Sequence, residues 1–426
     1  MELNNWHIET KCIQEGYQPK DGEPRVLPIY QSTTFKYDSS ETVGKLFDLE
    51  ENGFFYTRLA NPTVDCVERK IAALEGGVGA MCTSSGQAAS LITILNLCSE
   101  GDHVIASGAI YGGTTNLFTV TLKRLGIEVT LINADSTEEE LEAAVRDNTK
   151  CIFAESIANP ALIIIDFELY AKVAHRHHIP FIVDNTFATP INFRPLEHGA
   201  DIVIHSTSKY MDGHAVALGG VIVDGGTFDW NDEKFPGFTQ PDESYHGMVY
   251  ARDCKESAFI VKARVQLMRD LGSAPAANSA FLLNLGLETL HLRMERHCSN
   301  ALKAAKWLQA NEKIDWVEYP GLPGSRYYER AQKYMPNGTC GVIAFGPKGG
   351  REAAMKLMDS LKLAAIVVHV ADARTSVLHP ASTTHRQLSD EQLKEAGVKP
   401  ELIRMSIGLE NIDDIIADLE QAVAQI

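Results

Sequence analysis

Residues 61–223 alternate short apolar runs with stretches of helical periodicity, and this alternation restricts the fold more than any other feature of the chain. The apolar runs do not alternate with polar residues, which is typical of strands buried on both faces. Parallel strands also need helical connections between them. The pattern therefore predicts an α/β fold with a large, mostly parallel sheet that helices cover on both faces. We place its strands at 78–83, 103–106, 128–132, 151–154, 181–183, 202–205 and 220–223, and its helices at 87–98, 117–124, 137–146 and 167–177.

A further helix, with clear start and stop signals, precedes the first strand. Asn61 is a favourable N-cap, and Pro62 suits the first helical position because its missing N–H would have no partner there. Gly76 and Gly77 end the helix. Its apolar residues fall on one face, as expected of a helix that buries one side. They are Val64, Val67, Ile71 and Leu74.

The chain on either side of this region has a different character. Residues 1–60 show little periodicity and many turn formers, so we expect an extended arm that cannot form a core alone and packs on another part of the molecule or on another subunit. Beyond residue 259, a long helical stretch at 274–310 and several strands predict a smaller α+β domain. The expected parts are an arm (1–60), a large domain (61–259) and a small domain (260–426). Strands of the small domain are placed at 314–318, 341–345, 364–368 and 403–407, and its last helix at 412–423.

Charge and cysteine content narrow the class of function. The net charge of −17 argues against nucleic acid or an anionic membrane as a partner, because both are polyanions. No apolar run approaches the ~18 residues that would span a bilayer, and residues 1–11 lack the apolar segment of a signal peptide. The eight cysteines are scattered, without a CxxC pair or a Cys/His cluster at zinc spacing. We interpret them as reduced thiols of a cytoplasmic protein and expect no metal site.

Motifs of several common enzyme classes are missing from the chain. The sequence contains no GxGxxG, GxxxxGK[ST], GxSxG or HExxH pattern. These absences argue against a Rossmann dehydrogenase, a P-loop enzyme, a serine hydrolase and a zincin.

Polar residues follow three of the predicted strands, at the carboxyl edge where open α/β sheets bind ligands. Ser85, Gly86 and Gln87 lie between a strand and a helix, where backbone N–H groups and the helix dipole suit a phosphate. Taken alone, such a turn is more often a simple helix cap. Asp184 ends the apolar strand 181–183, and a buried carboxylate there requires a cation.

The third group comprises Ser206, Ser208 and Lys209, directly after the strand 202–205. Lys209 alone would be interpreted as a surface lysine. The groups together fit pyridoxal 5′-phosphate (PLP), which needs a lysine for an imine, an acid to keep its ring nitrogen protonated, and donors for a dianionic phosphate. We therefore predict that Lys209 carries PLP as a Schiff base and that Asp184 faces the ring nitrogen.

These residues lie in motifs that resemble the Cys/Met-metabolism family of PLP-dependent enzymes, which has fold type I. The most specific are VDNTFATP (183–190) and HSTSKYMDGH (205–214). Six further runs match in family order, so the resemblance covers nearly the whole chain. They are YTRLANPT (56–63), SSGQAA (84–89), YGGT (111–114), ESIANP (155–160), HPASTTH (379–385) and RMSIGLE (404–410).

The resemblance implies a role for each matching residue. Lys209 would carry the cofactor and shuttle protons, Asp184 would pair with the ring nitrogen, and Asn159 would hydrogen-bond the phenolic oxygen of the ring. Tyr111 would stack on the ring and assist proton transfer; without the family it is simply a core aromatic after a strand. The phosphate would be bound by Ser85, Gly86, Gln87, Ser206 and Ser208.

Further implied roles concern the substrate and the subunit assembly. Arg404 would clamp the substrate α-carboxylate, although alone it would fit a structural ion pair. Tyr56 and Arg58 would reach the phosphate of a neighbouring subunit, which implies a homo-oligomer, expected to be a tetramer. His369 departs from the family pattern: it stands near the substrate carboxylate, where lyases tend to carry serine and sulfhydrylases often asparagine, so it puts the exact substrate in doubt.

Three segments resemble the O-acetylhomoserine sulfhydrylase branch of the family, namely 111–118, 235–250 and 372–385. This branch implies replacement at Cγ of O-acetyl-L-homoserine by sulfide or methanethiol, giving L-homocysteine or methionine and acetate. Alternatives within the family are a methionine or cystathionine γ-lyase and a γ-synthase. A non-catalytic PLP-binding protein and an unrelated α/β binding protein are alternatives of other classes.

Overall fold

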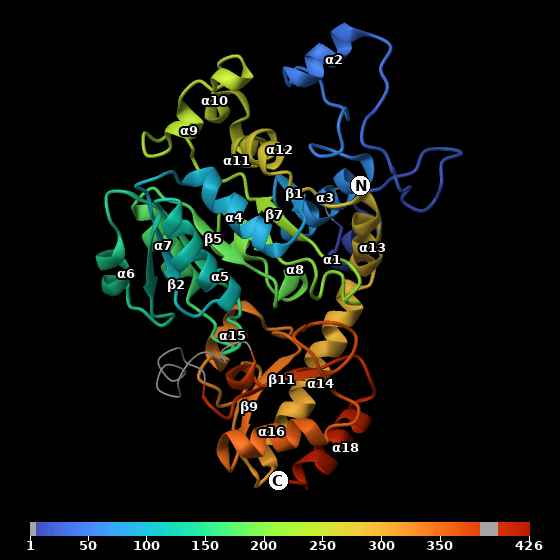
Figure 1. Ribbon diagram of the computed structural model, residues 1–426, viewed down its shortest axis with the longest axis vertical. Coiled ribbons are helices and arrows are strands. Elements are labelled where there is room, and N and C mark those ends of the chain that lie inside the picture. The colour runs from blue at the N-terminus through green and yellow to red at the C-terminus, as the bar shows by residue number, and fades with distance from the viewer. Residues whose placement is uncertain (1–5, 384–398) are drawn as a thin grey trace.

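The computed structural model describes residues 6–383 and 399–426, so Thr384 and His385 of the HPASTTH run lie outside the described residues. The chain forms two sheets, which Figure 1 shows one above the other. The larger sheet has seven strands in the order β1-β7-β6-β5-β4-β2-β3. These are β1 (Gly79–Thr83), β2 (His103–Ser107), β3 (Glu128–Ile132), β4 (Thr149–Glu155), β5 (Phe181–Asp184), β6 (Ile202–His205) and β7 (Gly220–Asp224).

The larger sheet is mostly parallel, as predicted. Strands β3, β2, β4, β5 and β6 pair in parallel, whereas β7 runs antiparallel to both β6 and β1. Every residue of β2, β6 and β7 is buried. Because successive side chains of a strand point to opposite faces, both faces of the sheet are covered.

Helices follow the strands at the predicted places. They are α4 (Gly86–Leu97), α5 (Gly112–Asn116) continuing as the π-helix η2 (Leu117–Leu122), α6 (Glu138–Ala144) and α7 (Phe167–Arg176). The first helix of the region, α3 (Pro62–Glu75), has the predicted signals: Asn61 accepts a hydrogen bond from the N–H of Thr63, and Gly76 ends the helix with a φ of 83°. That left-handed conformation favours glycine. Shorter helices follow β5 and β7: α8 (Thr189–Asn192), α9 (Pro236–Thr239), α10 (Tyr250–Asp253), α11 (Ala258–Lys262), the π-helix η6 (Ala263–Met268) and α12 (Arg269–Leu271).

The smaller sheet has five strands in the order β10-β11-β12-β9-β8. The helices α16 (Gly350–Ser360) and α18 (Ile412–Val423) pack with it in a second apolar core. The predicted strand at 364–368 is only two residues long and exposed, and β11 was not predicted. The strands are β8 (Ile314–Glu318), β9 (Val342–Pro347), β10 (Ala365–Ile366), β11 (Ser376–Leu378) and β12 (Ile403–Ser406).

The predicted helical stretch 274–310 forms two helices, α13 (Ala277–Glu288) and α14 (Leu290–Ala310). Helix α13 and α14 up to Cys298 pack in the core of the larger sheet, and α14 from Ala301 onward packs in the core of the smaller one. Helix α14 therefore joins the two sheets. The predicted division at residue 259 stays a prediction.

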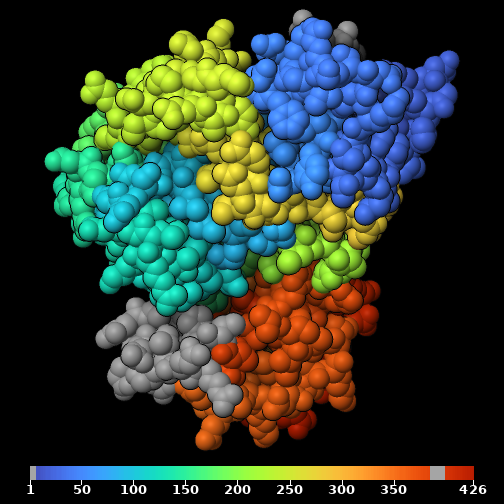
Figure 2. Space-filling model, turned by 45° about the horizontal axis from the view of Figure 1, so that its top comes forward, coloured from blue at the N-terminus to red at the C-terminus, as the bar shows by residue number. Residues whose placement is uncertain are grey.

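The N-terminal arm contains two helices, α1 (Ile8–Gln14) and α2 (Ser40–Phe47). Helix α1 packs against α3, α13 and α14, whereas α2 stands away from the sheet (Figure 1). Figure 2 shows the arm (blue) beside the yellow segment that contains α10 to α12. Among residues 6–383 and 399–426, no helix combines the length and the apolar character needed to cross a membrane.

Candidate active site

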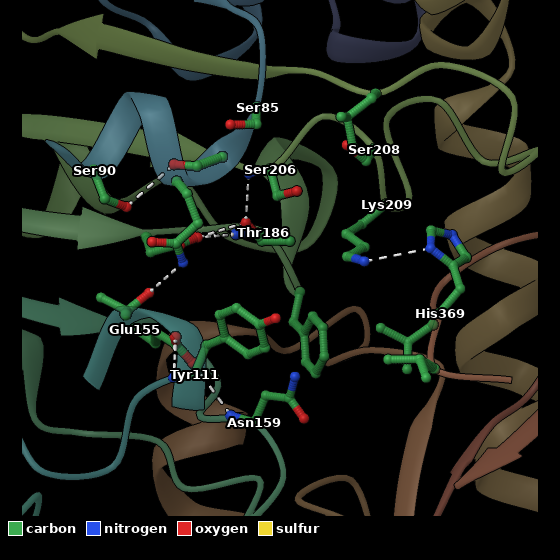
Figure 3. A pocket seen from close by; sticks show the side chains of 18 of the residues that line it. Ser85, Ser90, Tyr111, Glu155, Asn159, Thr186, Ser206, Ser208, Lys209 and His369 are labelled. Atoms are coloured by element: carbon green, nitrogen blue, oxygen red, sulfur yellow. Dashed lines mark hydrogen bonds between the residues drawn. The ribbon is translucent and has the colours of Figure 1, made fainter. Parts of the chain in front are cut away.

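A cavity of about 630 Å³ lies at the carboxyl ends of β4, β5 and β6, where segments of the smaller sheet complete its wall. This volume is in the range of sites that enclose a small molecule. Most of the residues that the sequence singled out lie around it (Figure 3). They are Ser85, Gly86, Gln87, Tyr111, Asn159, Asp184, Ser206, Ser208, Lys209, His369 and Arg404.

Lys209 follows β6 and points its amine into this cavity, so the interpretation as a surface lysine is wrong. Burial, followed by the positive charge of Arg404, lowers the pKa of the amine to about 8. A sizeable fraction of the amine is therefore neutral at physiological pH, as a proton acceptor must be. The amine lies 3.3 Å from Nδ1 of His369.

Asp184 ends β5 and is held by Thr186. Its Oδ1 accepts hydrogen bonds from the Thr186 N–H (3.0 Å) and hydroxyl (2.5 Å). The same hydroxyl oxygen accepts the N–H of Ser206 (2.8 Å), so it links β5 to the residue after β6. Burial raises the pKa of Asp184, and the hydrogen bonds from Thr186 and the charge of His205 oppose that effect. A cation facing this carboxylate would favour its ionised form.

The sequence interpretation missed Thr186. Its signal was the spacing, because an Asp side chain often accepts the N–H two residues ahead.

The N-terminus of α4 and the residues after β6 form a corner rich in hydrogen-bond donors. The side chain of Ser85 accepts the N–H of Ala88 (3.1 Å), so its role as a helix cap is present in addition to its place at the cavity. A Cβ at Gly86 would lie 2.7 Å from Cβ and 2.9 Å from Cα of Ser206. Glycine is therefore needed for the close approach of α4 to β6. The hydroxyl of Ser208 is paired with both the N–H and the carbonyl of Gly219.

Glu155 is a buried carboxylate of the cavity that the sequence interpretation did not single out. Its two oxygens accept the backbone N–H groups of Tyr111 (2.6 Å) and Asn159 (3.2 Å). Burial, followed by the charge of Asp184, raises the pKa of Glu155 well above its usual value. Glu155 therefore fixes the backbone of two predicted ring contacts. The side chain of Tyr111 stands in the cavity and is 46% exposed.

Arg404 reaches the cavity from β12 of the smaller sheet. Its guanidinium donates to Oδ1 of Asn159 (3.1 Å) and to the carbonyl oxygen of Val368 (3.1 Å). Its Nε is buried and has no partner among the described residues. Burial lowers the pKa of Arg404 to about 10, which leaves it positively charged at neutral pH. A buried cation with a free donor suits a small carboxylate ligand.

Tyr56 and Arg58 do not lie at this cavity. The guanidinium of Arg58 stacks over the ring of Tyr56, 5.1 Å from its centroid. Both line a second cavity of about 1070 Å³ between the arm and residues 244–269. The segment 235–250 reaches this second cavity through Tyr245 and His246, and His246 pairs with Asp48 of the arm at 3.0 Å.

The residues of the first cavity fit PLP. The amine of Lys209, the carboxylate of Asp184 and the donor-rich corner supply the three kinds of group that this cofactor requires. The free Nε of Arg404 also leaves a buried donor for a bound carboxylate. Among residues 6–383 and 399–426, no cluster of three or more His, Cys, Asp or Glu side chains suits a metal ion.

Comparison with known proteins gives the same cofactor. The model of the "Cys/Met metabolism PLP-dependent enzyme" family matches residues 9–424. The chain is 44% identical to the O-acetyl-L-homoserine sulfhydrylase of Leptospira meyeri over 99% of this chain and 98% of that protein. It is 46% identical to the O-acetyl-L-homoserine sulfhydrylase of Corynebacterium glutamicum over the same shares of the two chains.

A solved structure extends the comparison to the fold. A putative O-acetylhomoserine (thiol)-lyase from Campylobacter jejuni superposes with a TM-score of 0.95 at 38% identity, covering 98% of this chain and 100% of that chain. It carries N′-pyridoxyl-lysine-5′-monophosphate. The predicted fold class, a large mostly parallel sheet with a smaller α+β part, is confirmed.

Proposed function

The chain belongs to the Cys/Met metabolism family of PLP-dependent enzymes, and from that premise we propose that it catalyses replacement at Cγ of O-acetyl-L-homoserine. Sulfide would give L-homocysteine, methanethiol would give methionine, and acetate would leave. The observation that carries this proposal is the similarity, 44% and 46% identity over almost the whole chain, to two proteins named O-acetyl-L-homoserine sulfhydrylase.

Lys209, Asp184 and the corner at the start of α4 are the groups that would hold the cofactor. PLP in such a site withdraws electrons from the substrate Cα and so makes its proton acidic. Lys209 is suited to take that proton, since burial and Arg404 bring the pKa of its amine to about 8. Asp184 would face the ring nitrogen, and the two hydrogen bonds from Thr186 favour its ionised form against the effect of burial.

Arg404 would bind the α-carboxylate of the substrate. Its guanidinium is fixed by Asn159 and Val368, so it is oriented before the substrate arrives. With the carboxylate held there, Lys209 would remove the Cα proton, a second proton would leave Cβ, and acetate would leave Cγ. Sulfide or the thiol would then add at Cγ.

A homo-oligomer, expected to be a tetramer, is part of the proposal. Among the described residues that line the first cavity, Lys209 and Arg404 are the only ones with a cationic side chain at neutral pH. Lys209 is assigned to the imine and Arg404 to the substrate carboxylate, so neither is left for the phosphate. Tyr56 and Arg58 line the second cavity instead. We expect the arm of one copy to place Arg58 near the phosphate of another.

Mixing inactive Lys209→Ala with inactive Arg58→Ala protein should restore activity through mixed dimers, and failure to restore it would count against shared sites.

We also expect the protein to act in the cytoplasm. All eight cysteines are free, and seven of them are buried. This state suits a reducing compartment.

The activity test compares two reactions of the purified enzyme. O-acetyl-L-homoserine with sulfide should give L-homocysteine, whereas L-methionine alone should give little 2-oxobutanoate. The opposite result would assign the chain to the γ-lyases of the family. The variant Lys209→Ala should lose turnover in both assays, and substantial residual activity would exclude its role as the proton shuttle.

A further inference from the structure

A carboxylate and a histidine are buried together next to Asp184, outside the lining of the first cavity. Glu75 is the last residue of α3 and His205 the last residue of β6, and their side chains are 0% and 1% exposed. Nε2 of His205 lies 2.6 Å from Oε1 of Glu75, which also accepts the side-chain N–H of Asn185 at 3.0 Å. Of these two partners, His205 is the one that can carry a positive charge. Because a buried carboxylate is costly without a cation, the proton of the contact belongs on the imidazole.

The register of the larger sheet puts this imidazole close to Asp184. Asp184 pairs with Ile204, the residue before His205, and the N–H of Asn185 binds the carbonyl oxygen of Ile204 at 2.9 Å. The imidazole belongs to the strand beside β5, whereas Glu75 belongs to a helix packed on the sheet, so the positive end of the pair lies nearer to Asp184. Burial raises the pKa of Asp184, and the charge of His205 opposes that rise.

Asp184 needs such a cation because its other neighbours do little to favour its ionised form. The described residues give its carboxylate two hydrogen bonds, both from Thr186. Strand β5 lies between β4 and β6, and the buried carboxyl group of Glu155 pairs with Asp184 in the register of β4. Asp184 therefore has a second acid on one side and the imidazole on the other. A positive charge on His205 offsets the repulsion from Glu155.

We propose that His205 is a positioning residue of the site: as the imidazolium partner of Glu75, it keeps Asp184 ionised and so keeps the proton of the contact between Asp184 and the cofactor on the ring nitrogen. This inference rests on the pairing of Asp184 with the ring nitrogen that is proposed above. No bond of the substrate is made or broken at His205, and its own proton stays on the imidazole. Its effect is on the electron-withdrawing power of the bound cofactor, which is greatest when the ring nitrogen is protonated.

The test uses the holoenzyme reconstituted with PLP that carries ¹⁵N in its ring, because the NMR chemical shift of that nitrogen differs between a protonated and a neutral ring. The double variant His205→Gln/Glu75→Gln removes both charges, and the amide nitrogen of glutamine can take the place of Nε2. It should move the ring nitrogen from protonated towards neutral. It should also raise the dissociation constant for PLP at least about fivefold, as expected when an opposite charge in the interior is lost. Glu75→Gln alone should move the signal the same way, because the imidazole loses the charge that holds its proton.

His103→Gln is the matched control, since it removes a buried histidine of the same sheet that carries no charge. His103 begins β2, at the edge of the sheet away from the cavity, and its ring binds Thr149 and Thr130 at 2.9 and 2.8 Å. Burial lowers the pKa of His103 to about 4, so the ring is neutral at physiological pH. This variant should unfold at a lower urea concentration and keep the ring signal and the PLP affinity of the wild type.

Several outcomes overturn the proposal. It fails if the double variant keeps the wild-type ring signal, if its dissociation constant for PLP stays within about twofold of that for His103→Gln, or if Glu75→Gln leaves the ring protonated. Weaker PLP binding with an unchanged ring signal would assign the pair to packing alone. The measurement needs neither an acyl-homoserine nor a thiol, so loss of the sulfhydrylase assignment would leave it intact. A wild type with a neutral ring nitrogen would overturn the role of Asp184 as well.

Discussion

Replacing Thr186 with valine should weaken cofactor binding, because one hydroxyl connects the acid of the site to the neighbouring strand. That hydroxyl donates to Oδ1 of Asp184 at 2.5 Å and accepts the N–H of Ser206 at 2.8 Å. Valine has nearly the same shape as threonine, so the backbone and the N–H of Thr186 that also binds Asp184 should keep their places. The change removes two hydrogen bonds and little else.

The magnitude follows from the charge of Asp184. A hydrogen bond to a charged group contributes about 1.5–3 kcal/mol, and the unpaired Ser206 N–H adds a further cost. If most of this loss falls on the ionised carboxylate, the dissociation constant for PLP should rise about 10- to 100-fold, at ~1.4 kcal/mol per factor of ten. Burial already raises the pKa of Asp184, and loss of the hydroxyl raises it further. Since the protonated acid cannot pair with the ring nitrogen, the variant should lose PLP at a higher pH than the wild type as the solution is acidified.

The assay is a titration of cofactor-free protein with PLP, followed by the visible absorbance of the bound cofactor at several pH values. Thr186→Ser is the matched control, because it keeps the hydroxyl and loses only a methyl group. A dissociation constant for Thr186→Val within about twofold of that for Thr186→Ser would refute the argument, since a loss of one charge-assisted hydrogen bond cannot be that small.

Three further predictions concern other parts of the molecule. Gly86→Ala should weaken PLP binding about 5- to 150-fold in the same titration, because a steric clash of this kind costs about 1–3 kcal/mol and the new methyl group would lie 2.7 Å from Cβ of Ser206. Arg404→Lys should raise KM for O-acetyl-L-homoserine about 10- to 100-fold with a smaller change in kcat, since lysine cannot bind Asn159 and a carboxylate through one planar fork; an unchanged KM would exclude the clamp. The pKa of buried His297 is lowered to about 4 in the folded protein, so stability is lost as pH falls from about 6.5 towards 4, because the unfolded chain takes up a proton that the folded chain does not. At pH 5 this costs about 2 kcal/mol of unfolding free energy, and urea unfolding should show a smaller loss between pH 7 and 5 in His297→Asn than in the wild type.

The larger sheet could be predicted from the sequence because its strands are buried on both faces. A run such as 151–154 is apolar throughout and lies between two helices, so the sequence indicated both that it is a strand and where it lies. The direction of a strand could not be predicted in this way. Strand β7 is as apolar as its neighbours β1 and β6, yet it runs antiparallel to both. An apolar run carries no information about direction, which depends on the length and path of the connection.

The smaller part was predicted less well, for reasons of length and packing. The stretch 274–310 has helical periodicity throughout, but the structure has two helices there, because the helix is interrupted at Thr289 between α13 and α14. Periodicity indicates which residues are buried, but it does not indicate whether they pack in the core of the larger sheet or in that of the smaller one. Strand β11 has three residues, too few to show any pattern.

At the site, the residues that contribute chemistry were predicted and the residues that hold them were missed. Lys209 follows an apolar strand and Asp184 ends one, and together they fit a cofactor, whereas Arg404 was assigned through the family resemblance; all three line the cavity. Glu155 and Thr186 act on the backbone of Tyr111 and Ser206, which are 44 and 20 residues away in the chain. Both contacts exist only once the strands are side by side, so nothing local in the sequence marks them; the spacing of Asp184 and Thr186 is the local signal that could have singled out Thr186.

Because the site combines two sheets, its geometry depends on how firmly they are joined. Lys209 and Asp184 belong to the larger sheet, whereas Arg404 and His369 belong to the smaller part. Within residues 6–383 and 399–426, the hydrogen bonds of these four side chains join the two parts at two places, Arg404–Asn159 and Lys209–His369. Helix α14 joins the two cores along one side. A second connection comes from the helix α15 (Tyr328–Tyr334) and its N-cap: Tyr327 and Arg330 bind Asp135, which follows β3, at 2.9 and 2.7 Å. These connections restrict rotation of one sheet against the other. This restriction holds Arg404 and His369 of the smaller part in contact with Asn159 and Lys209 of the larger one, at 3.1 and 3.3 Å.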